Sequence, residues 1–366
     1  MLQMKKKYTT YGKLLYIVLF IALYGLFRSQ PALTEQWYST GLYPYIGRVV
    51  RFLLGWIPFS VGDILYTGLA LGVVYCVIRY FRRIRRAPLH FFKKVGKGVI
   101  IFVSLFYFLW GFNYYRHPLS VQLGWNFSYT EAELEQVTTR LVAEANALHQ
   151  RLALSKEQAV KMPFTPKEVY EKMPQGYNRL SQRFPQFVLY TPSVKSSLYN
   201  KILTYMGYSG YLNPFTGEAQ VNALATQYSF PVTVAHEMAH QLGYASEKEA
   251  NFIGFLVTYD HEERYFRYSA TLFALRYCLK EIRKISVEKH KEYMDRIRPG
   301  VLQNYTEAYE FWSQYENPME EVFKNSYDTF LKANAQEGGI QNYDYVTGML
   351  IYYLMHKINR DYLQNE

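Results

Sequence analysis

The main pattern along the chain is a set of three apolar stretches in its first third, followed by a long region in which apolar and polar residues alternate. The stretches are Leu14–Phe27, Val61–Ile78 and Val99–Phe112, and aromatic residues extend each of them. A helix needs roughly 20 mainly apolar residues to cross a bilayer. We therefore predict three transmembrane helices, at about 12–28, 60–80 and 98–114, in a membrane anchor that comprises residues 1–116.

The rest of the chain, residues 117–366, has the pattern of a folded helical domain outside the membrane. Capping boxes at Thr130–Glu133 and Thr165–Glu168 predict helices near 130–153 and 165–183. Helical patterns resume at Pro231 and continue to the end of the chain. We expect breaks between these later helices near residues 260–263, 298–300 and 335–340.

Strands are predicted only in the middle of this domain. The stretch "QFVLYTP" (186–192) has the composition of a short strand. The stretch "GYLNPFTGEAQVNA" (210–223) predicts two strands around a turn from Asn213 to Gly217. The expected fold class is mainly α, with three transmembrane helices followed by a mostly helical α+β domain that contains a small sheet.

The charge is distributed unevenly and orients the chain in the membrane. Residues 1–116 contain sixteen Lys and Arg but only two acidic residues, Glu35 and Asp63, whereas the remaining residues carry a small net negative charge. Eight of these basic residues lie in the link between the second and third stretches. By the positive-inside rule, this link and the N-terminus are cytoplasmic, and the domain after residue 113 faces outward. This distribution does not support a nucleic-acid partner.

Two features near the membrane surface are also predicted. Asp63 follows Ser60 at the start of the second stretch, where we expect it to cap the helix. Segment 34–58 is amphipathic, with Val49, Leu53 and Trp56 opposite Arg48 and Arg51. We expect this segment to lie along the outer interface of the bilayer.

The stretch "HEMAH" (236–240) contains the candidate catalytic residues. Pro231 and Gly243 are placed to start and end a helix over about 231–242. Such a helix carries His236 and His240 on one face, one turn apart, where both imidazoles can bind the same Zn²⁺ ion. Glu237 lies beside them as the general base for a water that the metal activates. A surface helix rich in His and Glu is the alternative reading of this stretch.

A third ligand is needed to leave one open position on a tetrahedral ion, and Glu247 and Glu249 are the nearby candidates. Ser246 and Glu249 form a capping-box pattern at the start of the next helix, which already gives Glu249 a structural role. Helical periodicity places the small residues Ala250 and Gly254, together with Asn251, on the side of Glu247. We therefore favour Glu247 as the third ligand, with Asn251 hydrogen-bonded to a ligand histidine.

The chain also resembles a family of bacterial membrane proteins, domain of unknown function 3810, found mostly in Bacteroidetes. The residues that carry the resemblance are "WGFNYYRHPL" (110–119), "SGYLNPFTGEAQVN" (209–222), "HEMAHQLGYASEKEANFIG" (236–254) and "SYDTFLKANAQEGGIQNY" (326–343). Locally, the Glu247–Asn251 stretch is similar to the E-x-x-A-D motif of gluzincin peptidases, with asparagine in place of aspartate. The resemblance implies a zincin-like fold in a multi-pass protein of the bacterial cytoplasmic membrane.

Two functions remain open from the sequence. The first is a membrane-anchored zinc metallopeptidase of gluzincin type, which hydrolyses a peptide or protein substrate outside the cytoplasmic membrane and has the lipid bilayer as its other partner. The second is a catalytically inactive, zinc-stabilised scaffold or receptor module. An intramembrane protease is disfavoured, because the residues around the motif are too polar for a long apolar span.

Overall fold

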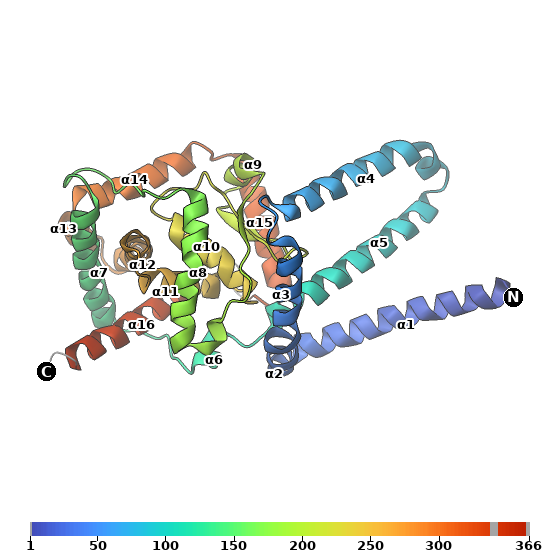
Figure 1. The fold of residues 1–366 in the computed structure, drawn as a ribbon, viewed down its shortest axis with the longest axis horizontal. Coiled ribbons are helices and arrows are strands. Elements are labelled where there is room, and N and C mark those ends of the chain that lie inside the picture. The colour runs from blue at the N-terminus through green and yellow to red at the C-terminus, as the bar shows by residue number, and fades with distance from the viewer. Residues whose placement is uncertain (1, 337–342, 364–366) are drawn as a thin grey trace.

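The computed structural model describes residues 2–336 and 343–363, which fold into a mainly helical body from which three long helices project (Figure 1). The projecting helices are α1 (Leu2–Ser29), α4 (Val61–Arg86) and α5 (Pro88–Leu109). All three leave the same side of the body, and α4 and α5 run antiparallel and approach each other toward their far ends (Figure 1). The mainly helical fold with a small sheet is as predicted.

The remaining elements form the body. They are α2 (Pro31–Leu33), the π-helix η1 (Thr34–Leu42), α3 (Tyr43–Leu54), the 3-10 helix η2 (Gly111–Tyr115), α6 (Leu119–Leu123), α7 (Glu131–Leu152), α8 (Pro166–Arg183), the 3-10 helix η3 (Pro185–Phe187), β1 (Val194–Ser196), α9 (Asn200–Tyr205), β2 (Gly210–Leu212), β3 (Ala219–Val221), α10 (Phe230–Gln241), α11 (Glu247–Tyr259), α12 (Arg264–Ile285), α13 (Val287–Arg296), α14 (Pro299–Ser313), α15 (Pro318–Ala333) and α16 (Tyr343–Leu363).

Among the described residues, one helix is long and apolar enough to cross a membrane, over Val61–Arg82 of α4. Leu15–Ser29 and Pro31–Leu54 qualify together as a second span, but the chain bends by 103° between them. By length and apolar composition, the described residues therefore contain one or two candidate spans and not the three that were predicted. In α5, three lysines precede the apolar run Val99–Leu109. At 1.5 Å per residue this run covers roughly 16 Å, about half of the hydrocarbon core.

The predicted local signals account for much of the body. Both capping boxes form: the side chains of Thr130 and Thr165 accept hydrogen bonds from the backbone nitrogens of Glu133 and Glu168 at the starts of α7 and α8. The expected break near 260–263 separates α11 from α12, and that near 298–300 separates α13 from α14. Most of the break expected at 335–340 lies outside the described residues.

The small sheet has the strand order β1-β3-β2, with β1 parallel and β2 antiparallel to β3. The hairpin of β2 and β3 is as predicted: Gly217 has a φ of +63° and its nitrogen donates to the Asn213 carbonyl at 2.8 Å. The strand predicted at 186–192 was wrong. Pro185 starts η3 there, Thr191 has a φ of +47°, and β1 forms only after Pro192, where the chain can pair with β3.

The start of α4 is anchored in the sheet by buried polar groups. The Glu218 carboxylate accepts a hydrogen bond from the Gly62 nitrogen at 2.7 Å, where the N-terminal dipole of the helix favours a negative charge. Ser60 accepts from the Asp63 nitrogen at 3.0 Å. The prediction that Asp63 caps the helix was wrong, because its carboxylate accepts from the Leu198 nitrogen at 2.6 Å. The helix is capped by Ser60 and Glu218 instead.

The amphipathic segment 34–58 lies on the body with its arginine side inward. Arg51 is buried and donates hydrogen bonds to the carbonyls of Tyr190 and Thr191 at 3.1 and 3.0 Å. On the opposite side, Phe52 of α3 and Trp56, which follows the helix, are 71 % and 78 % exposed. The two faces of the segment are thus separated as the sequence predicts, and the apolar one is left without a protein partner among the described residues.

Candidate metal centre

Helix α10 holds the two histidines in the predicted arrangement. Pro231 occupies its first turn, and Gly243, with a φ of +83°, ends it by donating its N–H to the His240 carbonyl at 2.9 Å. Glycine is favoured at this position because a left-handed backbone places a Cβ too close to the neighbouring carbonyl. His236 and His240 are therefore one turn apart on the same face of the helix.

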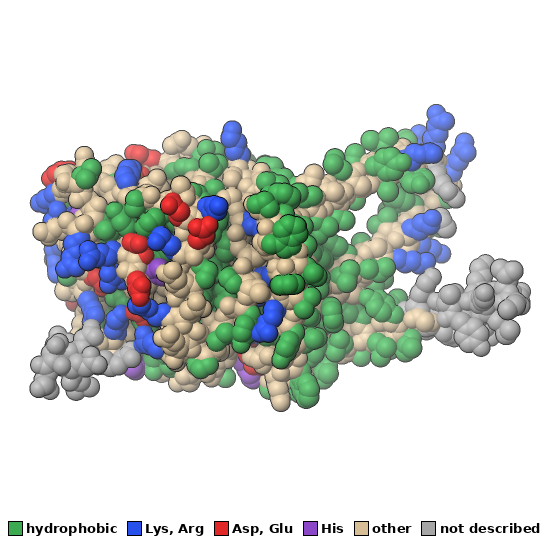
Figure 2. Space-filling view, in the orientation of Figure 1, with side chains coloured by type: hydrophobic (Ala, Val, Ile, Leu, Met, Phe, Trp, Pro, Cys, Tyr) green, Lys and Arg blue, Asp and Glu red, His purple; other side chains and the backbone are tan. Residues whose placement is uncertain are grey.

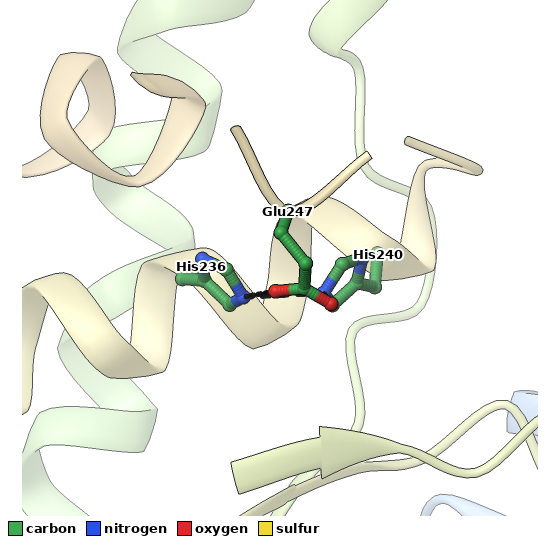
Figure 3. A group of neighbouring side chains, drawn as sticks. All are labelled: His236, His240 and Glu247. Atoms are coloured by element: carbon green, nitrogen blue, oxygen red, sulfur yellow. Dashed lines mark hydrogen bonds and ion pairs between the residues drawn. The ribbon is translucent and has the colours of Figure 1, made fainter. Parts of the chain in front are cut away.

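The side chains of His236, His240 and Glu247 point toward one another (Figure 3). The Nε2 atoms of the two imidazoles are 3.2 Å apart. The Glu247 carboxylate lies 3.1 Å from Nε2 of His236 and 3.7 Å from Nε2 of His240. Two ligands that bind one ion tetrahedrally at 2.0–2.1 Å are separated by roughly 3.3 Å. The spacing of the three groups therefore fits a tetrahedral zinc site.

Hydrogen bonds on the other side of each ring define the chemistry of the centre. Nδ1 of His236 lies 3.0 Å from Oδ1 of Asn251, and Nδ1 of His240 lies 2.7 Å from the Tyr244 carbonyl. Because both partners are acceptors, each Nδ1 carries a hydrogen and each neutral ring presents its Nε2 lone pair to the centre. When both rings are neutral, two lone pairs and a carboxylate face one another with no donor between them, an arrangement that favours a cation.

Close packing of α10 and α11 brings Glu247 to the histidines. Gly254 is so near α10 that a Cβ built on it would lie 3.0 Å from the His236 nitrogen, and Ala250 is fully buried. The predicted small residues are therefore at the contact between the two helices. The structure places Asn251 against His236, on the face that the sequence indicates.

Glu249 points away from the histidines, and the capping box predicted for it was wrong. Ser246 does precede α11 as its N-cap, but its side chain makes no cap hydrogen bond. Instead, a Glu249 oxygen accepts from the Leu119 nitrogen at 2.6 Å. This contact satisfies the Leu119 N–H at the start of the short helix α6. Because the two residues are far apart in the chain, no local sequence pattern predicts the contact.

The sequence does not indicate the role of Tyr327. Its hydroxyl, from α15, donates to Oε1 of Glu247 at 2.5 Å, and burial raises its pKa well above the usual value. Tyr327 thus holds the carboxylate oxygen of Glu247 that also faces His240. The only sequence signal for it is its place within the family-like stretch 326–343.

Glu237 is buried beside the three ligand candidates. Its Oε2 has no hydrogen-bond partner among the described residues. Burial raises the pKa of Glu237 to about 8, and the nearby Glu247 charge acts in the same direction. A Cβ on Gly210 of β2 would come within 2.6 Å of Oε1 of Glu237, so only glycine leaves room for this carboxyl group. A buried carboxyl with an unused oxygen is the group expected of a general base.

The three other ionisable groups differ in charge because of their surroundings. Burial lowers the pKa of His240 to about 4, so this ring is neutral at pH 7. Burial opposes a charge on His236 as well, but its hydrogen bond to Glu247 and the charges of Glu237 and Glu247 raise its pKa to about 9. For Glu247, the charges of the two histidines and the hydrogen bonds from His236 and Tyr327 outweigh burial and lower the pKa to about 2. In the absence of a metal ion, His236 is therefore protonated and carries the positive charge that faces the Glu247 carboxylate.

The C-terminal end of α10 is held by an aromatic cluster at the base of the projecting helices. Tyr43 donates to the Gln241 carbonyl at 3.1 Å, and the Trp110 indole donates to the His240 carbonyl at 3.2 Å. Trp110 immediately follows α5, and both residues belong to a buried cluster with Phe112 and Tyr115. The candidate centre is thus directly connected to the end of a projecting helix.

Two cavities meet at the centre, one of about 830 Å³ and one of about 1000 Å³. Both are lined by His236, Glu237 and Glu247. The candidate residues are therefore open to a molecule that enters from either side. Space of this size exceeds what a single metal ion and its water require, and it is typical of ligand sites.

The sequence profile of a family described as protein of unknown function (DUF3810) matches residues 38–351. The chain belongs to this DUF3810 family. No curated protein and no solved structure is significantly similar to the chain. The match to DUF3810 extends from η1 into α16, and it includes α4, α5, the histidines, Glu247 and Tyr327.

Proposed function

We propose that this DUF3810 protein is a membrane-anchored zinc metallopeptidase of zincin type that hydrolyses peptide bonds on the outer side of the cytoplasmic membrane. The observation that carries the proposal is the convergence of His236, His240 and Glu247 beside the buried carboxyl of Glu237. Two imidazoles and one carboxylate are the ligand set of thermolysin-like zinc enzymes, which leaves a fourth position open.

Each residue around the centre has a separate role in the proposed hydrolysis. His236, His240 and Glu247 would hold the zinc ion, which when bound would activate a water molecule and polarise the carbonyl group of a substrate. Glu237 takes a proton from the attacking water and delivers it to the leaving amine. Asn251 and the Tyr244 carbonyl fix the tautomers of the two histidines. Tyr327 holds the Glu247 carboxylate in place by its hydrogen bond.

The open edge of the sheet supplies a backbone partner for an extended substrate. The bonded pairs Ser209–Asn222 and Asn213–Glu218 define the pattern of the β2–β3 ladder. In an antiparallel ladder, bonded pairs alternate with unbonded ones, so the N–H and C=O groups of Gly210 and Leu212 point away from β3. Gly210 also lies against Glu237. A peptide that added to this edge would pass the general base.

Several features support insertion of all three projecting helices into the bilayer. Apolar side chains cover their exposed surfaces, and basic side chains gather at the far end of the α4–α5 pair (Figure 2). Lys93, Lys94 and Lys97 lie at that far end, where long basic side chains can reach the cytoplasmic headgroups and lengthen the span of α5. The exposed apolar face of α3 fits the opposite interface of the same membrane.

The proposal is tested with the full-length protein in nanodiscs, by zinc analysis and by digestion of a broad peptide library. Glu237→Gln keeps the shape of the side chain but removes the base, so it should retain one zinc per chain and lower kcat/KM by roughly 10²–10⁴-fold. Glu263→Gln, an acidic residue outside the centre, serves as the matched control. If the wild type binds zinc but cleaves no peptide, the protein is a zinc-stabilised scaffold instead.

A further inference from the structure

The two cavities at the centre differ in chemistry and in position. They share Gly207, Tyr208 and Gly210 at the edge of the sheet as well as the candidate catalytic residues. The smaller one extends toward the projecting helices, whereas the larger one extends toward α12, α13 and α14, at the other end of the body (Figure 1). A chain bound along β2 would therefore have one end near the membrane and the other far from it.

The cavity on the membrane side is apolar and rich in aromatic residues. It reaches Tyr66 in the second turn of α4 and Phe106 in the last turn of α5. On its other sides it is lined by residues such as Phe323 and Phe330 of α15. Ile202 of α9 also lines it and is 56 % exposed, so the apolar lining continues to the surface. Such a lining can bury the apolar side chains of a bound molecule, but it provides few polar partners for charged side chains.

The cavity on the far side is basic. Arg276, Lys280 and Arg283 follow one another at helical spacing on α12 and present one face to it. Apart from Glu237 and Glu247 in the centre itself, every charged residue in the lining is basic. All three α12 side chains are exposed. Their combined field attracts carboxylates.

We propose that the substrate is a membrane-anchored polypeptide, cleaved close to the bilayer, with apolar residues on the membrane side of the scissile bond and acidic residues on the far side. This inference rests on the proposed peptidase activity. The apolar cavity receives the segment that leaves the bilayer, and the α12 face binds the carboxylates that follow. Both cavities are lined by Glu237 and His236. The apolar and the acidic preference therefore apply to the two sides of the same scissile bond.

The test uses the full-length protein in liposomes with two forms of one randomised octapeptide library. In the first form, each peptide joins a single transmembrane segment to a soluble reporter; in the second, the same peptide is free in solution. We expect the anchored form to be cleaved at least about tenfold faster, because anchoring raises the effective concentration. Cleaved sequences should be enriched in apolar residues on the membrane side and in Asp or Glu on the far side.

Single substitutions test the contribution of each cavity separately. Arg283→Glu should lower cleavage of sequences with acidic far-side residues by about fivefold to tenfold, whereas Lys291→Gln, an exposed change on α13 outside the cavity, should not. Ile202→Gln should reduce selection of apolar residues on the membrane side, and Leu154→Gln, which is 96 % exposed in the native protein and outside the cavity, is its control.

The outcomes distinguish the two proposals. If no library peptide is cleaved in a Glu237-dependent manner, the peptidase proposal fails and this inference fails with it. If cleavage depends on Glu237 but proceeds equally well on the free peptides, or shows no acidic preference that Arg283→Glu reverses, the peptidase proposal stands and the substrate class proposed here is wrong.

Discussion

Gly254 on α11 lies against the backbone of His236 on α10, so that a Cβ at residue 254 would come within 3.0 Å of the His236 nitrogen and of the Val232 carbonyl. This contact sets the distance between the two helices. One helix carries the histidines and the other carries Glu247 and Asn251. The geometry of the candidate centre therefore depends on a residue that has no side chain and does not touch the ligand atoms.

A larger residue at this position should open the centre. We expect Gly254→Val to lower the free energy of unfolding by about 1–3 kcal/mol and to weaken zinc binding, because the helices must separate. Gly254→Ala should have a smaller effect, since its single methyl group needs a shift of only a few tenths of an ångström. Thermal unfolding and zinc titration of the two variants check this order. A valine variant that binds zinc as tightly as the wild type would contradict the role of Gly254.

The two glutamates of α11 should differ sharply in their effect on zinc. Glu247→Gln removes the carboxylate that faces both histidines and should reduce the zinc content to near zero. Burial raises the pKa of Glu249 to about 7, so an uncharged amide at that position is expected to be tolerated and to keep the zinc. Zinc analysis of the two purified variants decides between them. Loss of zinc in Glu249→Gln alone would assign the third ligand to Glu249.

Tyr327 should affect the metal without contacting it. Tyr327→Phe removes only the hydroxyl that donates to Glu247, and we expect zinc affinity to fall by roughly 10–100-fold. Tyr45→Phe, on a tyrosine that is 64 % exposed and lines neither cavity, is the matched control. Competition with a chromogenic chelator measures both affinities. An unchanged affinity in Tyr327→Phe would mean that α15 does not support the ligand set.

Local sequence signals predicted the parts of this protein that local forces determine. The capping boxes at Thr130 and Thr165, the turn at Asn213–Gly217 and the glycine stop at Gly243 each depend on residues within one or two turns, and each is where the sequence places it. The shared face of His236 and His240 follows from helix geometry alone. The hairpin and the two-histidine helix could therefore be derived without coordinates.

Long-range contacts decided the features that the sequence could not predict. The contact of Glu249 with Leu119 spans 130 residues, and that of Tyr327 with Glu247 spans 80. Arg51 binds the carbonyls of Tyr190 and Thr191 where a strand was predicted. In each case a buried polar group found its partner in a distant segment, and only the assembled fold shows which one.

Zinc affinity should depend on pH because the metal must displace a proton. Without metal, the pKa of His236 is raised to about 9, so its ring is protonated at neutral pH and cannot act as a ligand. Affinity should therefore rise by about tenfold per pH unit from pH 6 to pH 8, with release of one proton from His236. His240, with a pKa lowered to about 4, should release none. Calorimetry in two buffers of different ionisation enthalpy counts the protons, and a release near zero would contradict the assignment.

The outward apolar face of α3 should lie in the membrane interface, together with the projecting helices. Trp56, which follows α3 on this side, is 78 % exposed, whereas Trp312 lies on α14 and lines the basic cavity. In nanodiscs that contain brominated lipids, tryptophan fluorescence is quenched only near the acyl chains. We expect Trp56→Phe to remove a much larger share of the quenched signal than Trp312→Phe does. If the two variants lose equal shares, α3 does not touch the bilayer, and the proposed position of the centre close to the membrane surface loses its support.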